Sequence, residues 1–190
     1  MRRRTVLGSA TAVALAGAAA AVRPTAAQEA TPGSLADHPL TGVWLAMANP
    51  PLPDDPQVAA PSVFGADGTV LLVFPLTQAG PQGVQFNSPV VGTWEADGER
   101  RGHFTAVQTL SDAAGTYLGS VTIDGYPEVG ADGQTFVDDG SKAVITIRDA
   151  AGAVVQEVTG VFARPVTATR MGVGAPGFPA ATPTAGTPTG

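Results

Sequence analysis

Turn sequences recur along the middle of this 190-residue chain and constrain its fold more than any other feature. Asp and Gly tolerate the backbone angles of tight hairpin turns, so each Asp-Gly pair between β-prone runs predicts a hairpin. The runs between the turns are short and rich in Val, Thr, Ile, Phe, Trp and Tyr, which suit pleated strands. The pattern therefore predicts an all-β fold with antiparallel neighbours. The turn signals are Asp67-Gly68, Asp97-Gly98, Asp132-Gly133, Asp139-Gly140, Asp112–Gly115 and Asp149–Gly152.

The spacing of the turns predicts eight strands. Apolar and polar residues alternate along several of them, which indicates one dry face and one wet face. Eight strands that close on themselves leave no exposed edge and enclose a space for side chains or one small ligand. We therefore expect an eight-stranded antiparallel up-and-down barrel, with a Greek-key sandwich as the alternative. The expected strands lie near residues 42–48, 62–66, 69–75, 89–96, 102–111, 116–126, 142–148 and 153–164, and a shorter piece at 134–137 extends the seventh.

The N-terminal segment 1–27 has the layout of an export signal. Three arginines precede an apolar run over residues 6–22, and Thr25-Ala26-Ala27 provides a small-residue cleavage site. The segment Arg3-Arg4-Thr5-Val6-Leu7 resembles a twin-arginine signal, although Gly8 stands where that class usually has lysine. The apolar run is short for a membrane span, and a retained anchor is the alternative. We expect an exported protein, extracellular, periplasmic or associated with the cell wall, whose mature chain has no stable membrane span and whose signal engages the export machinery.

Composition divides the remaining chain and excludes several partners. Residues 28–40 are expected to form a flexible linker, 41–164 the barrel, and 165–190 a disordered tail rich in Pro, Thr, Ala and Gly. Removing residues 1–27 leaves 10 − 4 = 6 basic side chains against 16 acidic ones, a net charge of −10. Such a chain is a poor partner for nucleic acid. The absence of cysteine excludes disulfides and thiolate chemistry.

Gly42-Val43-Trp44 opens the first expected strand, and Arg164 closes the last. In this layout the chain resembles the calycin (lipocalin-like) group, with allene-oxide-cyclase-like barrels as the alternative relatives. The resemblance implies that Trp44 packs near the base of a barrel and that a basic side chain from the end of the last strand, here Arg164, lies across its indole. It also implies a large rim loop after the first strand, where residues 49–61 hold five prolines.

The candidates for chemistry are few. His103 is predicted on the wet face and His38 in the flexible linker, and no nucleophile motif or phosphate-binding loop is present. The acidic stretch 132–140 lacks the spacing of a calcium loop and is explained by two turns. We therefore expect no catalytic residue, metal or cofactor.

What remains is binding. Parity places three polar side chains among apolar inward neighbours, where such groups orient a small ligand. They are Gln108 beside Phe104 and Ala106, Tyr117 beside Val121 and Ile123, and Gln156 beside Val154, Val158 and Phe162. We expect a non-catalytic barrel that binds a small apolar or amphiphilic ligand. The alternatives are a cyclase-like barrel enzyme acting on a lipid-derived substrate, and a surface or structural module with a solid core.

Overall fold

The computed structural model describes residues 34–49, 56–80, 83–160 and 164–178. By its internal contacts the chain divides into Met1–Thr31 and Pro32–Gly190. The first unit, which holds the predicted export signal, lies outside the described residues. None of the helices within the described ranges has the length and apolarity needed to cross a membrane.

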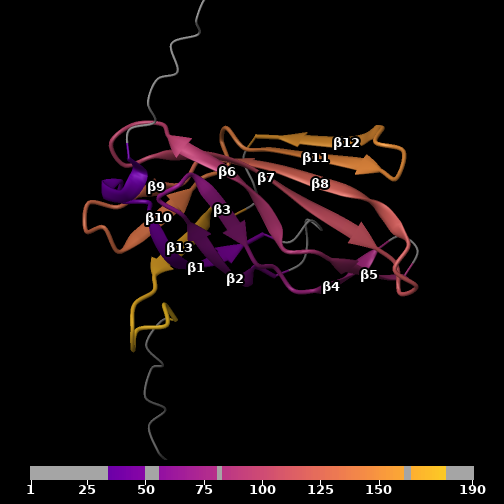
Figure 1. Cartoon of the computed structure of the whole chain (residues 1–190), viewed down its shortest axis with the longest axis horizontal. Coiled ribbons are helices and arrows are strands. Elements are labelled where there is room, and N and C mark those ends of the chain that lie inside the picture. The colour runs from indigo at the N-terminus through magenta and orange to yellow at the C-terminus, as the bar shows by residue number, and fades with distance from the viewer. Residues whose placement is uncertain (1–33, 50–55, 81–82, 161–163, 179–190) are drawn as a thin grey trace, which may run out of the picture. The chain divides into compact units, whose positions relative to one another are not determined.

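The described part is all-β, as predicted (Figure 1). A single 3-10 turn, η1 (Leu35–Asp37), precedes the strands. The strands are β1 (Gly42–Ala48), β2 (Val58–Phe64), β3 (Thr69–Leu72), β4 (Thr77–Gly80), β5 (Gly83–Asn87), β6 (Val90–Ala96), β7 (Gly102–Ser111), β8 (Tyr117–Gly125), β9 (Glu128–Val129), β10 (Thr135–Asp138), β11 (Val144–Asp149), β12 (Val154–Thr159) and β13 (Val166–Arg170).

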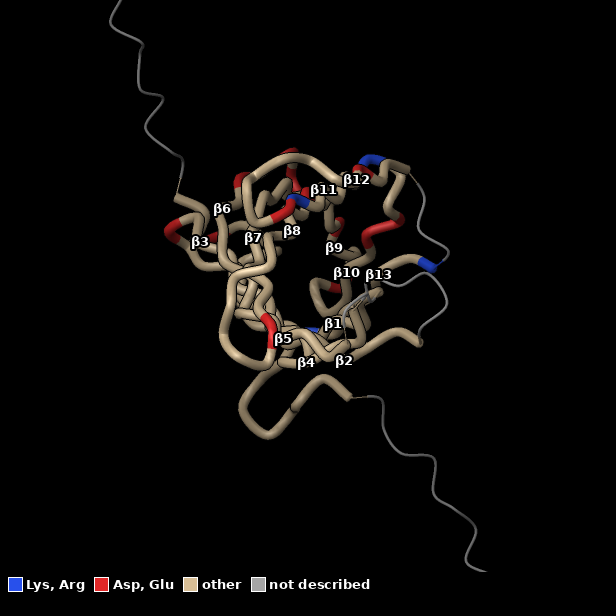
Figure 2. Tube along the Cα trace, turned by 90° about the vertical axis from the view of Figure 1, so that its right-hand side faces the viewer, with Lys and Arg blue, Asp and Glu red and all other residues tan. Residues whose placement is uncertain are grey.

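These strands form one antiparallel, curled sheet rather than the eight-stranded up-and-down barrel that the sequence predicted. Its order is β12-β11-β8-β7-β6-β3-β2-β1-β13-β10-β9, and the β4–β5 hairpin joins it through β7. Seen end-on, the strands from β7 through β1 to β10 follow a ring, and β11 and β12 stand off from it (Figure 2). An isolated bridge between Arg101 and Glu128 connects the start of β7 to β9. The up-and-down order fails because β13 returns to pair with β1, which places β10 beyond it.

The predicted turns are confirmed, and their aspartates explain why they form. In five of the six turns the signal joins two paired strands, and only Asp139-Gly140 connects strands that do not pair. The carboxylate of Asp67 accepts the backbone N–H of Thr69 at 2.9 Å, and Gly68 has a φ of 84°. In the same way Asp112 accepts the N–H of Thr116 at 2.8 Å, which lowers the pKa of this carboxyl group below its ordinary value.

The core lies inside the curl and takes its buried side chains from strands that include β1, β2, β6, β7 and β10. Five aromatic side chains pack edge to face with ring centroids 5.1–6.2 Å apart. This is the preferred geometry for aromatic pairs, because the positive edge of one ring meets the negative face of the next. All five are buried: Trp44, Phe64, Trp94, Phe104 and Phe136.

Described elements extend beyond the predicted barrel domain, residues 41–164, at both ends. The expected linker 28–40 contains η1 and ends in the fully buried Leu40. The expected disordered tail contains β13, which pairs on both sides, with β1 and with β10. Residues 179–190 of the tail lie outside the described residues.

Two strand predictions also fail. The β4–β5 hairpin was not expected, since its residues lie between the expected strands 69–75 and 89–96. The expected last strand 153–164 is β12, whose described residues are all exposed, although Val154, Gln156 and Val158 were predicted to face inward. The strand is at the edge of the sheet and pairs only with β11, so neither of its faces packs on the core. Phe162, also expected inside, lies outside the described residues.

Candidate functional site

The indole of Trp44 is covered by a basic side chain from the last strand, but that side chain is Arg170 and not Arg164. The Arg170 guanidinium lies 4.1 Å from the centroid of the Trp44 ring. It donates hydrogen bonds to the carbonyl oxygens of Gly133 at 2.7 Å, Thr41 at 3.0 Å and Pro39. Burial lowers the pKa of Arg170 from its ordinary value, because desolvation disfavours the charged form. The guanidinium thus connects the first strand, the last strand and the segment that precedes β1.

The sequence prediction failed on Arg164 because β13 was not foreseen. Arg164 is exposed, and its carbonyl oxygen accepts a hydrogen bond from Asn49 Nδ2 at 2.8 Å. The Gly-x-Trp motif itself has a clear physical reason. A Cβ at position 42 would lie 2.5 Å from Arg170 Nη1, and Gly42 has a φ of 142° that side chains disfavour. Glycine therefore makes room for the arginine at Trp44.

His38 is ordered, contrary to the expectation that it lies in a flexible linker. Its Nδ1 accepts the N–H of Leu40 at 3.1 Å, and its Nε2 donates to the carbonyl oxygen of Gly98 at 3.2 Å. The ring meets Trp94 edge-on with centroids 5.3 Å apart. The segment before β1 therefore packs against both tryptophans, since Trp44 Nε1 donates to the carbonyl oxygen of Leu40 and the His38 ring contacts Trp94.

The three predicted ligand contacts do not come together. Gln108 is buried, as expected, and its Nε2 donates to the carbonyl oxygen of Ser88 at 3.0 Å. Tyr117 is 47% exposed at the start of β8, and Gln156 is exposed on the edge strand β12. Only Gln108 faces the interior of the sheet, so a site that uses all three is not formed.

Two buried amides on β5, Gln85 and Asn87, were missed by the sequence analysis. Asn87 Nδ2 donates to the carbonyl oxygen of Pro75 and to Oε1 of Gln78. Within the described residues, no donor lies within hydrogen-bond distance of its buried Oδ1. Such an orphaned acceptor is costly in a folded protein. Neither amide was predicted, because a hydropathy pattern does not reveal buried amides and the β4–β5 hairpin that positions them was not expected.

Part of the interior is lined by small side chains. Five buried alanines occupy inward positions of β1, β2, β7 and β13. Ala46 is the cross-strand neighbour of both Ala60 and Ala168, so the small side chains are grouped. Aromatic rings thus fill one part of the interior, and short side chains line another part of its wall. The five are Ala46, Ala48, Ala60, Ala106 and Ala168.

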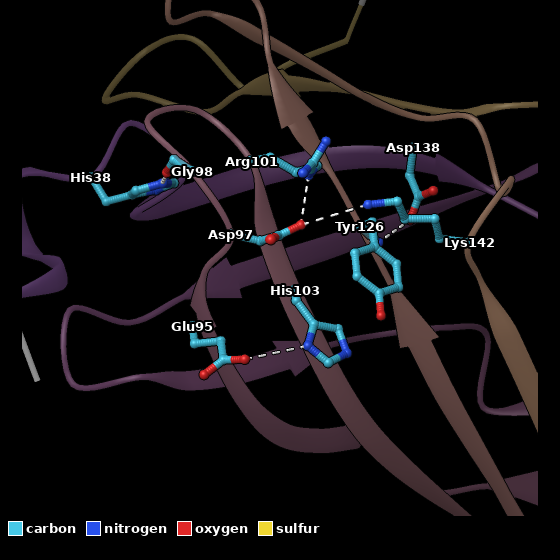
Figure 3. A network of polar contacts seen from close by, with 9 residues as sticks. All are labelled: His38, Glu95, Asp97, Gly98, Arg101, His103, Tyr126, Asp138 and Lys142. Atoms are coloured by element: carbon cyan, nitrogen blue, oxygen red, sulfur yellow. Dashed lines mark hydrogen bonds and ion pairs between the residues drawn. The ribbon is translucent and has the colours of Figure 1, made fainter. Parts of the chain in front are cut away.

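A polar network lies on the outer face of β6, β7 and β8 (Figure 3). The ring of His103 stacks on Tyr126 with centroids 4.5 Å apart and an interplanar angle of 7°. Its Nδ1 is 3.5 Å from Glu95 Oε1, and its Nε2 is 3.6 Å from Asp124 Oδ1. Lys142 Nζ lies 5.3 Å from the centroid of Tyr126, on the side of the ring away from His103 (Figure 3). As predicted, His103 is on the wet face of its strand.

An open groove of about 320 Å³ runs beside this network. Its walls include Arg100, Arg101, Tyr126, Glu128 and Lys142. Arg101 Nε donates to Asp97 Oδ2 at 2.7 Å, and Lys142 Nζ is 4.0 Å from the same oxygen. The hydrogen bond from Arg101, more than any other contact, lowers the pKa of Asp97.

The acidic stretch 132–140 is engaged in local structure. Asp138 is buried, and its two carboxylate oxygens accept the N–H groups of Tyr126 at 2.7 Å and Gly140 at 2.9 Å. Asp132 accepts the N–H of Gln134 at 2.9 Å. Among the residues that the structure describes, no group of three or more His, Cys, Asp or Glu is placed to hold a metal ion.

Comparison with known proteins identified no relative: no family model, curated protein or solved structure matches this chain. The physical arrangement of its own residues is therefore the basis for any functional conclusion.

Proposed function

We propose that the chain is an exported, non-catalytic binding protein of calycin-like architecture whose interior holds one small apolar or amphiphilic molecule. The observation that carries the proposal is the unpaired, buried Oδ1 of Asn87. An acceptor in that position gains a hydrogen bond when a ligand brings a hydroxyl or N–H group to it. Gln108 adds an amide that faces the same interior.

The distribution of side-chain size supports the same proposal. Rings close one end of the curl, where Arg170 fixes Trp44 to the segment before β1. The grouped alanines have short side chains, which leave more room for a ligand in the interior than closely packed large side chains would. The calycin-like assignment rests on Gly42, Trp44 and a basic side chain across the indole, a role that Arg170 fills.

A pair of substitutions on β2 tests this proposal. Ala60→Leu adds a large side chain to the interior, and Ala59→Leu adds the same side chain to the exposed face of the same strand. If the interior accommodates a ligand, Ala60→Leu occupies that space: the neutral fluorophore N-phenyl-1-naphthylamine binds at least about tenfold more weakly, and the free energy of unfolding changes by less than about 1 kcal/mol. Ala59→Leu leaves both quantities unchanged.

The opposite result identifies a solid-core module. In that case the unmodified protein does not bind the fluorophore, native mass spectrometry of the exported protein detects no retained molecule, and Ala60→Leu overpacks the interior at a cost of about 1–3 kcal/mol.

Export is tested by a separate measurement. N-terminal sequencing of the protein collected outside the cytoplasm should begin at Gln28, and an intact Met1 on that material would contradict the export signal.

A further inference from the structure

Positive charge is scarce in this chain and concentrated in one place. Six basic side chains follow residue 27, and three of them line the outer groove: Arg100, Arg101 and Lys142. They reach it from different segments, because Arg100 and Arg101 precede β7 while Lys142 follows β10. The remainder of the chain carries an excess of carboxylates. Anions are therefore repelled by most of the protein and least by this groove.

Most side-chain N–H groups of these three cations donate no hydrogen bond to another described residue. Arg101 uses one of its five N–H groups on Asp97. The ion pairs of Arg100 with Glu128 at 3.7 Å and of Lys142 with Asp97 at 4.0 Å are longer than hydrogen bonds. Asp97 Oδ2 lies near both Arg101 Nε and Lys142 Nζ, so these two cations already converge on a carboxylate oxygen. A second carboxylate can occupy the donors that face the groove.

The charge and walls of the groove define the size of the anion. The three cations are balanced by the carboxylates of Glu128 and Asp139 in the lining and of Asp97 beside it, 3 − 3 = 0, so the groove suits a monovalent anion better than a polyphosphate. Val137, which is 44% exposed, supplies an apolar wall. The volume of about 320 Å³ lies at the lower end of the range for small-molecule sites.

From these features we infer that the outer groove between the β6–β7 turn and the segment after β10 is a binding site for a small aryl or alkyl monocarboxylate. The carboxylate lies between Arg101 and Lys142, and its apolar part lies against Val137. Tyr126 supports the site from behind, since His103 stacks on one side of its ring and Lys142 lies on the other (Figure 3). This site is on the outside of the sheet and is independent of a ligand in the interior.

Benzoate and benzamide are the matched probes, since they share a ring and differ in charge. Titration of the full-length protein at constant ionic strength, followed by amide chemical shifts, should give saturable benzoate shifts at Gly130, Ser141 and Lys142. Benzamide should bind at least about tenfold more weakly, because charge-assisted hydrogen bonds are the stronger ones. Equal binding of the two probes, or shifts that stay linear in benzoate, would overturn the inference. So would shifts confined to interior amides such as Ala60.

Charge variants with opposite expected signs complete the test. Lys142→Gln should weaken benzoate binding about three- to tenfold, and Glu128→Gln should strengthen it by a similar factor, because it removes a repelling charge and releases Arg100. Both side chains are 53% exposed, so neither substitution threatens the fold. Arg148→Gln, a cation on β11 outside the groove, is the control and should leave the affinity unchanged. Changes of the same sign in the two groove variants, or equal effects of Lys142→Gln and Arg148→Gln, would refute the site.

Discussion

Replacing Arg170 by methionine removes the charge and the guanidinium donors while keeping a long apolar side chain over Trp44. Three hydrogen bonds from a charged donor contribute about 1.5–3 kcal/mol each, and the cation–π contact about 0.5–2 kcal/mol. Burial of the guanidinium opposes these gains, because removing the charge from water costs free energy. The same desolvation lowers the pKa of Arg170. Because single substitutions rarely exceed about 4–5 kcal/mol, we expect a loss of about 3–4 kcal/mol in the free energy of unfolding.

Urea denaturation followed by tryptophan fluorescence measures this loss, and the same variant should lower the Tm by about 10–15 °C. Arg164→Met is the matched control, because it removes an exposed arginine that reaches its one described partner, Asn49, through the backbone. That control should change stability by less than about 0.5 kcal/mol. Arg170→Lys keeps the charge but loses the planar fork, so it should recover less than half of the lost stability.

The reasoning fails if Arg164→Met costs as much as Arg170→Met, or if Arg170→Met is within about 1 kcal/mol of the unmodified protein. A double-mutant cycle with Trp44→Phe separates the contact with the ring from the hydrogen bonds. The coupling between positions 44 and 170 should be about 0.5–2 kcal/mol, and a value near zero would show that the guanidinium acts through the carbonyl groups alone.

Two further predictions concern the turns and the glycines. The pKa values of Asp67, Asp112 and Asp132 lie below the ordinary value of 3.8, so the stability that these carboxylates contribute is present above pH 3.8 and is lost as the pH falls through the folded-state values. Tm should therefore stay level from pH 7 to about 5 and fall below about pH 4. Asp112→Asn should reduce that acid-induced decrease, and an unchanged acid profile in this variant would count against the turn contacts. Gly92→Ala should cost about 3 kcal/mol or more, because its Cβ would overlap the Thr105 carbonyl oxygen. Gly172→Ala should cost less than about 1 kcal/mol in the same urea titration, because its Cβ would meet only the Ala175 Cβ, at 4.0 Å.

The sequence was a good guide wherever one residue and its near neighbours decide the structure. An aspartate followed by glycine forms a turn through contacts within four residues, as Asp112 does with Thr116, so no distant partner is needed. The alternation along β7 is equally local, and the burial of Phe104, Ala106 and Gln108 was predicted from parity alone.

Pairing between distant strands was beyond such reasoning. Residues 166–170 read Val-Thr-Ala-Thr-Arg, with too few apolar side chains to indicate a buried strand. Their order comes from two partners, β1 and β10, which are far away in the chain. By contrast, β12 has the β-branched composition of a core strand and is exposed along its length. Local β-propensity therefore selected the wrong last strand, and with it the wrong arginine, although the expected contact with Trp44 exists.

The same limit explains why both candidate sites were only partly foreseen. Gln108 was placed inside correctly because its strand is regular, whereas Asn87 depends on a hairpin that folds against the end of β7. The outer groove has no local signature at all, since Arg101, Tyr126 and Lys142 belong to three separate segments. The bridge from Arg101 to Glu128 brings the first two of these segments together. Asp138 places the third, because its two oxygens bind the backbone of Tyr126 and of Gly140. The one buried carboxylate of the acidic stretch thus fixes the distance between Tyr126 and the turn that carries Lys142, so the cations of the groove converge through backbone pairing that is set elsewhere in the sheet.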